Sequence, residues 1–216
     1  MIRKTVESLT WYDDPERIYK MMVGSRGWDY QINKVKLGIR DLALMSVLYI
    51  ATARITEVVG GTVRIQGRDM KLDPITKDQF IIEEDNLWLR RLPIIKQKFV
   101  KRGSRWVMIQ YPDEYPTRVD IPFFRSEGPI NKFTDMVLDH LDTVPEGEPV
   151  FNIGRRRAHQ VVTSTNPDWF PHYFRDMGLK FWKRYFENDA FKLKKFSGHK
   201  RWSSLENYMG EELFNS

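Results

Sequence analysis

The spacing of apolar residues changes twice along this chain, and that change restricts the fold more than any other sequence feature. Residues 37–53 form a nearly continuous apolar segment, which predicts a buried helix. Residues 62–122 contain short runs rich in Val, Ile, Trp and Phe between Gly, Pro and Asp, which is typical of antiparallel strands. Helical spacing returns after Pro129. The order of helices, strands and helices predicts an α+β fold, mostly helical, with a small antiparallel β-sheet.

The remaining helices are delimited by their spacing and by helix breakers. Residues 14–22 predict a short helix with Pro15 near its start, and Gly24 and Gly27 interrupt the helical pattern. Further helices are expected at 131–141, 155–164 and 168–187.

The helix expected at 168–187 has two different sides. His172 and Arg175 are expected to project from one side, away from the core. The opposite face is apolar and is expected to pack inward through Phe170, Tyr173, Phe174, Met177 and Phe181.

Composition narrows the classes of protein to consider. At 216 residues the chain is long enough for one domain with a substantial core. Lys and Arg number 35 against 29 Asp and Glu, and this excess favours a polyanionic partner. The absence of cysteine excludes disulfides, thiolate zinc sites and cysteine nucleophiles. The longest apolar run, 42–51, is too short to cross a bilayer, and no signal-peptide pattern is seen, so we expect a cytoplasmic protein without membrane association.

Two arginines occur in settings suited to holding a phosphate. Arg54 directly follows the apolar segment 37–53, so a rigid helix would present its planar guanidinium, which can grip a phosphate in a bidentate fork. Glu57, three residues on, can orient Arg54, although a local ion pair without further function is the alternative. Arg175 and His172 are also three residues apart and can reach one object, or else form an exposed pair on a solvated helix face.

The C-terminal part adds a candidate nucleophile. His199 follows Gly198, and Tyr208 lies nine residues further along the chain. A tyrosine hydroxyl can attack a phosphorus atom while cations hold the phosphate. Taken alone, a tyrosine near Leu205 is more often a core residue.

Five residues in this order resemble the active site of tyrosine recombinases, the phage-type integrases: Arg54, His172, Arg175, His199 and Tyr208. The resemblance spans about residues 34–210. It implies a tyrosine recombinase-like catalytic domain at 34–216, preceded by a short N-terminal helical segment at 1–33. The letters around Arg54 fit the family's first arginine motif, in which Glu57 has a supporting role.

The resemblance also implies a mechanism. Tyr208 would attack a DNA phosphate to form a 3′-phosphotyrosyl bond and release a 5′-hydroxyl. Arg54 and Arg175 would neutralise the phosphate oxygens, His199 would donate a hydrogen bond, and His172 would assist proton removal from the tyrosine. No metal and no cofactor is implied, because arginines supply the positive charge.

A general-acid lysine on a β-hairpin is the remaining part of the family's site. Lys96 is our first choice and Lys98 the second. Both lie in a run from 90 to 105 that contains basic residues and no acid, which suits strands along DNA, while 67–85 has the character of an insertion. The residues expected to bind DNA come from this run and from 192–201: Arg90, Arg91, Lys101, Arg102, Arg105, Lys194, Lys195, Lys200 and Arg201.

The expected partner is double-stranded DNA, with self-association into a tetramer on it, and three alternatives remain open. Type IB topoisomerases share this chemistry but relax supercoils, and the Gly-His pair before the tyrosine favours the recombinase. A metal-dependent nuclease needs a carboxylate cluster, for which Asp113 and Glu114 are candidates without the usual acidic-x-Lys continuation. A non-catalytic basic DNA-binding module would follow if Tyr208 were buried.

Overall fold

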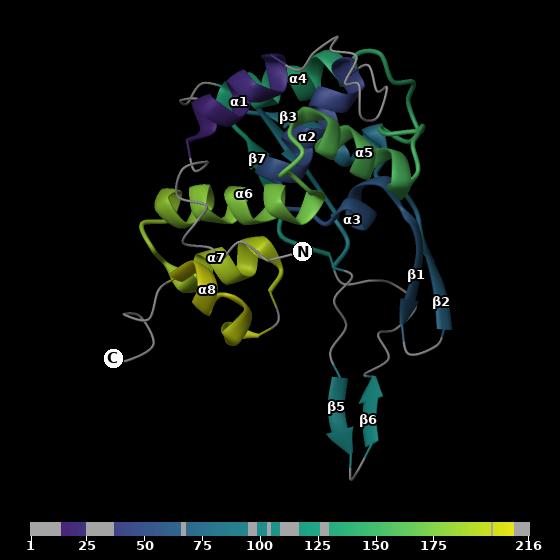
Figure 1. The fold of residues 1–216 in the computed structure, drawn as a ribbon, viewed down its shortest axis with the longest axis vertical. Helices are drawn as coiled ribbons and strands as arrows, with labels where there is room; N and C mark the ends of the chain where they lie inside the picture. Colours follow the sequence, from purple (N-terminus) through teal and green to yellow (C-terminus); the bar gives the residue numbers. More distant parts are fainter. Residues whose placement is uncertain are drawn as a thin grey trace.

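The fold, seen in a computed structural model, is α+β, as the sequence predicts (Figure 1). The structure describes residues 14–24, 37–65, 68–94, 99–102, 105–108, 117–125, 130–199 and 201–209. The helices are α1 (Pro15–Gly24), α2 (Ile39–Ile50), α3 (Ile55–Val59), α4 (Ile130–Leu141), α5 (Arg155–Thr165), α6 (Pro171–Tyr185), α7 (Ala190–Ser197) and α8 (Glu206–Met209). The strands are β1 (Gly61–Ile65), β2 (Arg68–Leu72), β3 (Phe80–Glu83), β4 (Asn86–Leu89), β5 (Phe99–Arg102), β6 (Arg105–Met108) and β7 (Ile121–Phe123).

Helix α2 is the centre of the core. It packs against α4, α5 and α6, and every residue from 41 to 50 is buried, because the helix is apolar on nearly all sides. The polar Ser46 is accommodated because its hydroxyl donates to the Leu42 carbonyl at 2.9 Å. Tyr49 stacks on Phe133 of α4 with ring centroids 4.9 Å apart. The buried helix predicted within 37–53 is therefore confirmed.

Helix α1 packs on α4 and contributes to the same core. Ile18 and Met22 are fully buried, and Lys132 of α4 donates to the Glu16 carboxylate at 2.9 Å. The helix predicted at 14–22 is therefore confirmed, and it continues to Gly24. The sequence pattern did not predict α7 or α8.

Helix α6 lies directly on α2 because a glycine faces α2 at the crossing. A Cβ atom on Gly178 would stand 2.0 Å from the Tyr49 carbonyl oxygen, so only glycine permits this approach. Four residues along, the Trp182 indole donates to the Ile50 carbonyl at 2.7 Å. The close approach brings the residues of α6 onto the end of α2.

The faces of α6 differ in part from the prediction. Tyr173, Phe174 and Met177 are buried as expected, whereas Phe170 precedes the helix and is 41% exposed. The expectation that Arg175 projects away from the core is wrong, because the segments at 51–52 and 197–199 cover that side of the helix and leave Arg175 1% exposed. His172 is exposed, as expected.

The strands between 61 and 123 are antiparallel, as predicted, but they form separate sheets. Strands β3, β4 and β7 make a three-stranded sheet in the order β3-β4-β7, whereas β1-β2 and β5-β6 are two-stranded ladders. Figure 1 shows β5 and β6 extending away from the helices. In β4, Leu87 and Leu89 point into the core while their neighbours are half-buried, which is the expected alternation of a strand on a core.

Among the described residues, no helix is long and apolar enough to span a membrane.

Candidate active site

The site begins at the turn between α2 and α3. Helix α2 ends at Ile50 and is capped by Ala51, and Arg54 is the residue directly before α3, so the arginine does lie at a helix junction as the sequence predicts. Thr52 in this turn has a positive φ of 45°, which is unfavourable for a β-branched residue. Its hydroxyl accepts from Arg118 at 2.9 Å and its carbonyl accepts from Arg175. These contacts hold the strained turn in place.

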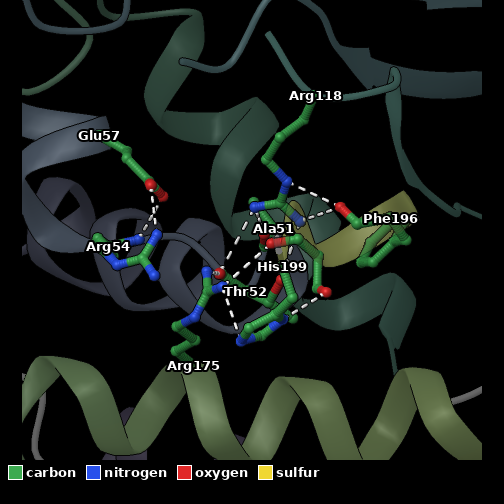
Figure 2. Close-up of polar contacts among 9 residues, drawn as sticks. Ala51, Thr52, Arg54, Glu57, Arg118, Arg175, Phe196 and His199 are labelled. Atoms are coloured by element: carbon green, nitrogen blue, oxygen red, sulfur yellow. Dashed lines mark hydrogen bonds and ion pairs between the residues drawn. The ribbon is translucent and has the colours of Figure 1, made fainter. Parts of the chain in front are cut away.

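Arg54 is braced by Glu57. The backbone N–H of Arg54 donates to Glu57 Oε2 at 2.7 Å, and Nη1 donates to Oε1 at 2.9 Å (Figure 2). The Glu57 side chain is 1% exposed and that of Arg54 is 26% exposed. Because the buried carboxylate binds both ends of the arginine, the guanidinium is fixed while part of it still faces solvent. The spacing of three residues predicted this pair.

Arg175 reaches the same turn from α6. Its Nη1 donates to the Thr52 carbonyl, and its Nη2 donates to the Ser197 carbonyl at 3.0 Å. Burial, and next the charge of Arg54, lower the pKa of Arg175 to about 10. The guanidinium is therefore tied to backbone oxygens of two segments that are far apart in the sequence.

His199 lies beside Arg175. Gly198 ends α7 in the left-handed conformation, with φ 69°, and thereby turns the chain so that His199 faces Arg175. The distance from Arg175 Nη2 to His199 Nε2 is 3.5 Å, and His199 Nδ1 lies 2.6 Å from Ser197 Oγ. Since a guanidinium only donates, Nε2 is assigned as the acceptor and Nδ1 as the protonated nitrogen. The glycine of the Gly-His pair is therefore needed for the turn that places His199 beside Arg175.

A second buried arginine, Arg118, was not anticipated. It lies just before β7, and it donates through Nε to the Phe196 carbonyl at 2.8 Å and through Nη1 to the Ala51 carbonyl (Figure 2). Burial, and next the charge of Arg175, lower its pKa to about 9. In the sequence, Arg118 stands between Thr117 and Val119 in a strand-like run, where an arginine normally faces solvent. No sequence signal marks it as buried.

Arg118 and Arg175 are stabilised together by helix ends. Their acceptors are the carbonyls at the C-terminal ends of α2 and α7, which carry partial negative charge and lack helical partners. Glu57 adds a full negative charge nearby, which favours the charged form of both arginines. Two like charges are thus tolerated in a buried site because three negative groups face them.

Tyr208 completes the cluster from α8. Its ring centroid is 6.2 Å from that of His199, and it is half-buried against the core. Its hydroxyl donates to Asp176 Oδ1, and His172 Nε2 lies 3.8 Å from the same oxygen. Burial first, and then Asp176, raise the pKa of Tyr208 well above its usual range, and burial likewise raises the pKa of Asp176. Asp176, like Arg118, was not anticipated from the sequence, although it directly follows Arg175.

An open pocket of about 730 Å³ adjoins the cluster. None of the described residues that line it is acidic. They come from α3, α5 and α6 and from the residues directly before α3 and α6: Arg54, Ile55, Thr56, Arg155, Arg156, His159, Phe170, Pro171 and His172. Helix α5 begins with three arginines, at the helix end where the dipole already favours an anion. These three arginines are consecutive in the sequence, at 155–157, but none of them was predicted as a site residue. The pocket suits an anionic ligand beside Arg54.

The basic run 90–105 does not contribute uniformly. Arg90 contacts Glu83 at 2.7 Å and Asp120 at 3.3 Å, and Arg91 contacts Asp78 at 3.2 Å. Residues outside the run, at 78, 83 and 120, therefore supply acids that the run lacks. Lys96, Lys98 and Lys200 lie outside the described residues, and Lys101, Arg102 and Arg105 are described only as backbone positions of β5 and β6. In the second run Lys195 and Arg201 are exposed, and Lys194 lies 4.2 Å from the Trp202 ring centre.

The part of the chain that the structure describes contains no group of three or more His, Asp or Glu side chains that could hold a metal ion. Asp113 and Glu114, the candidates for a metal-dependent nuclease, lie outside the described residues.

No described protein family, curated protein or solved structure matches this chain.

Proposed function

We propose that this chain is a site-specific DNA recombinase that cleaves and rejoins strands through a 3′-phosphotyrosyl intermediate, as tyrosine recombinases do. One observation carries the proposal. Arg54, Arg175, His199 and Tyr208 come from four separate segments of the chain, and they lie in one cluster beside a cationic pocket. Burial and Asp176 raise the pKa of Tyr208 in the free protein, and Arg175 and Arg54 oppose that rise by favouring negative charge on its oxygen, as attack on a phosphate requires.

In this mechanism the exposure of each residue decides whether it contacts the phosphate directly or acts through a neighbour. Arg54 reaches the pocket and grips the non-bridging oxygens of the phosphate, with Glu57 holding it in place. Arg175 lies behind it, and contributes positive charge and the orientation of His199. Tyr208 attacks the phosphorus and the 5′-oxygen leaves with a proton from Lys96 or Lys98. Arg155 and Arg156 extend the phosphate-binding surface along the DNA backbone.

The test is covalent trapping on a nicked suicide duplex, read on a denaturing gel. Wild type should form an adduct that persists in excess EDTA, and Tyr208→Phe should form none while keeping its affinity for DNA. Tyr185→Phe is the matched control, since Tyr185 is exposed on the last turn of α6 and away from the cluster, and it should behave as wild type. Loss of the adduct in EDTA, or an adduct with Tyr208→Phe, would refute the assignment.

The contribution of Arg54 can be measured in the same assay. Removing an oxyanion donor of this kind costs about 2.7–4 kcal/mol, so Arg54→Ala should cleave at least about a hundredfold more slowly. Arg91→Ala is the control, because Arg91 is exposed and paired with Asp78. Equal rates for the two variants would show that Arg54 is only a structural partner of Glu57.

The leaving-group acid can be identified by chemical rescue. A 5′-bridging phosphorothioate leaves without a proton, so it should restore cleavage to the variant that lacks the true acid. We expect rescue of Lys96→Ala. Rescue of Lys98→Ala alone would transfer the role to Lys98, and rescue of neither would remove both.

A non-catalytic DNA-binding module is the second candidate. It is favoured by the burial of Arg175 and by the contact that holds the Tyr208 hydroxyl on Asp176. On this alternative, wild type and Tyr208→Phe would bind DNA equally and neither would form an adduct.

A further inference from the structure

The hydroxyl that would act as the nucleophile already has a proton acceptor. Tyr208 on α8 donates its O–H to Oδ1 of Asp176 on α6, and α8 packs against α6. The Asp176 side chain is 15% exposed, so the carboxylate is largely shielded from water. The carboxylate is therefore the group placed to receive the Tyr208 proton.

Charged groups surround this pair. On α6, Asp176 faces His172, Arg175 and Lys180, each of which favours its ionised form. Around Tyr208, the cations are Arg175 and Arg54. Burial raises the pKa of Asp176 and these three neighbours oppose that rise, whereas burial and Asp176 raise the pKa of Tyr208 and the two arginines oppose it.

We propose that Asp176 is the general base that takes the Tyr208 proton during cleavage and returns it during rejoining. This inference rests on the proposed function. A tyrosine hydroxyl is a weak nucleophile at neutral pH, and a positioned base typically accelerates such a step by about 10²–10⁴. Because burial makes the Asp176 carboxylate more basic than an ordinary aspartate, it is better suited to this step than an exposed carboxylate.

Protons and bonds balance over the two steps. In cleavage the Tyr208 O–H bond breaks and an Asp176 Oδ1–H bond forms, while the tyrosine oxygen bonds to phosphorus. The bond from phosphorus to the 5′-oxygen breaks, and the lysine acid protonates that oxygen. In rejoining, the 5′-hydroxyl gives its proton back to the lysine and attacks phosphorus, and the tyrosine oxygen leaves with the proton from Asp176.

His172 then has a positioning role. The resemblance assigns proton removal to His172, but its Nε2 faces the Asp176 carboxylate at 3.8 Å, and Asp176 is the residue that contacts the hydroxyl. His172 therefore acts through Asp176, by holding the carboxylate and stabilising its charge. It also lines the pocket, so it can respond to bound DNA.

The first experiment compares Asp176→Asn with Asp135→Asn in single-turnover cleavage of the suicide duplex. Asparagine keeps an oxygen that can accept from Tyr208 but removes the base, whereas Asp135 is exposed on α4, which lies on the other side of α6 from α8 (Figure 1). We expect Asp176→Asn to cleave at least about a hundredfold more slowly, with Asp135→Asn unchanged. Cleavage by Asp176→Asn at or above the wild-type rate would overturn the proposal and make the contact a restraint on the nucleophile.

A second measurement separates a lost base from a lost fold. A fluorotyrosine placed at 208 in the Asp176→Asn protein has a more acidic hydroxyl and needs less help from a base. It should recover about tenfold or more of the lost rate, because a more acidic hydroxyl compensates for the missing base. No recovery, in a protein that melts like wild type, would show that Asp176 acts otherwise. If wild type itself forms no Tyr208 adduct, the proposed function fails and this inference fails with it.

Discussion

Two groups of arginines in this molecule have opposite surroundings. Arg118 and Arg175 are buried, and their guanidinium groups donate to backbone carbonyls at the ends of α2 and α7. Arg90 and Arg91, beside the β3-β4-β7 sheet, are more exposed and pair with carboxylates. The same side chain thus serves in one region to join helix ends and in the other to balance surface acids.

The difference shows why linear charge is a poor guide to a binding surface. Residues 90 to 105 carry no acid in the sequence, yet Glu83, Asp120 and Asp78 approach Arg90 and Arg91 in space. The pocket beside Arg54 gathers arginines from different helices with no acidic lining residue among those described. Arg155 and Arg156 therefore add positive charge at the pocket beyond the paired Arg54, where it can attract a phosphate.

The largest expected effect is on stability at the helix ends. Arg118→Met keeps much of the side-chain volume but leaves the carbonyls of Phe196 and Ala51 and the Thr52 hydroxyl without their donor. Each unsatisfied buried group costs about 1–3 kcal/mol, so the free energy of unfolding should fall by at least about 3 kcal/mol. Chemical denaturation measures this directly.

Arg91→Met is the matched control for that change. Its ion pair with Asp78 is exposed, and exposed pairs contribute at most about 1 kcal/mol. Similar losses for the two variants would break the distinction between the two groups of arginines.

These contrasts also explain what could be read from the sequence. The apolar segment predicted α2, and the spacing of Arg54 and Glu57 predicted their pairing, because both depend on neighbours within one or two helical turns. The burial of Arg118 depends on carbonyls 66 or more residues away, which no local pattern encodes. Asp176 was missed for the same reason, since its partner Tyr208 is 32 residues distant.

A second large effect is expected where α6 crosses α2. In Gly178→Ala the new Cβ would overlap the Tyr49 carbonyl, and it would also press on Thr52, so α6 must move away from α2. Overpacking of this kind typically costs about 1–3 kcal/mol. The shift should also weaken the contact of Arg175 with Thr52, and a lowered melting temperature together with slower cleavage would sharpen the link between packing and site.

Gly24→Ala provides the control, because nothing lies within 4 Å of a Cβ at that position. It should leave stability within about 1 kcal/mol of wild type, since alanine is the better helix former. An undisturbed Gly178→Ala would mean that the two helices can separate at little cost.

A loss of similar size should follow from Glu57→Gln. A glutamine amide is neutral and has one oxygen, so it cannot accept from both the Arg54 backbone N–H and the Arg54 guanidinium as the carboxylate does. Hydrogen bonds to charged groups contribute about 1.5–3 kcal/mol. Glu83→Gln, which affects a half-exposed pair with Arg90, should cost under about 1 kcal/mol. Equal unfolding free energies for these two variants would show that the buried Arg54–Glu57 pair stabilises the fold no more than the half-exposed Arg90–Glu83 pair.

The smallest effect concerns DNA affinity, and it extends the contrast between the two regions to binding. Arg156 is exposed, lines the pocket and belongs to the arginine-rich start of α5, whereas Arg91 already faces Asp78. A lysine or arginine that contacts one phosphate contributes about one to the slope of log affinity against log salt. We therefore expect Arg156→Ala to reduce that slope by about one. Arg91→Ala should reduce the slope less, because Arg91 is already paired with Asp78. The Asp78 carboxylate that this variant releases adds little repulsion toward DNA at a surface that salt already screens. Titrations of a duplex across a salt series measure both slopes. A larger change in slope for Arg91→Ala than for Arg156→Ala would indicate that DNA binds beside the β3-β4-β7 sheet and not at the pocket.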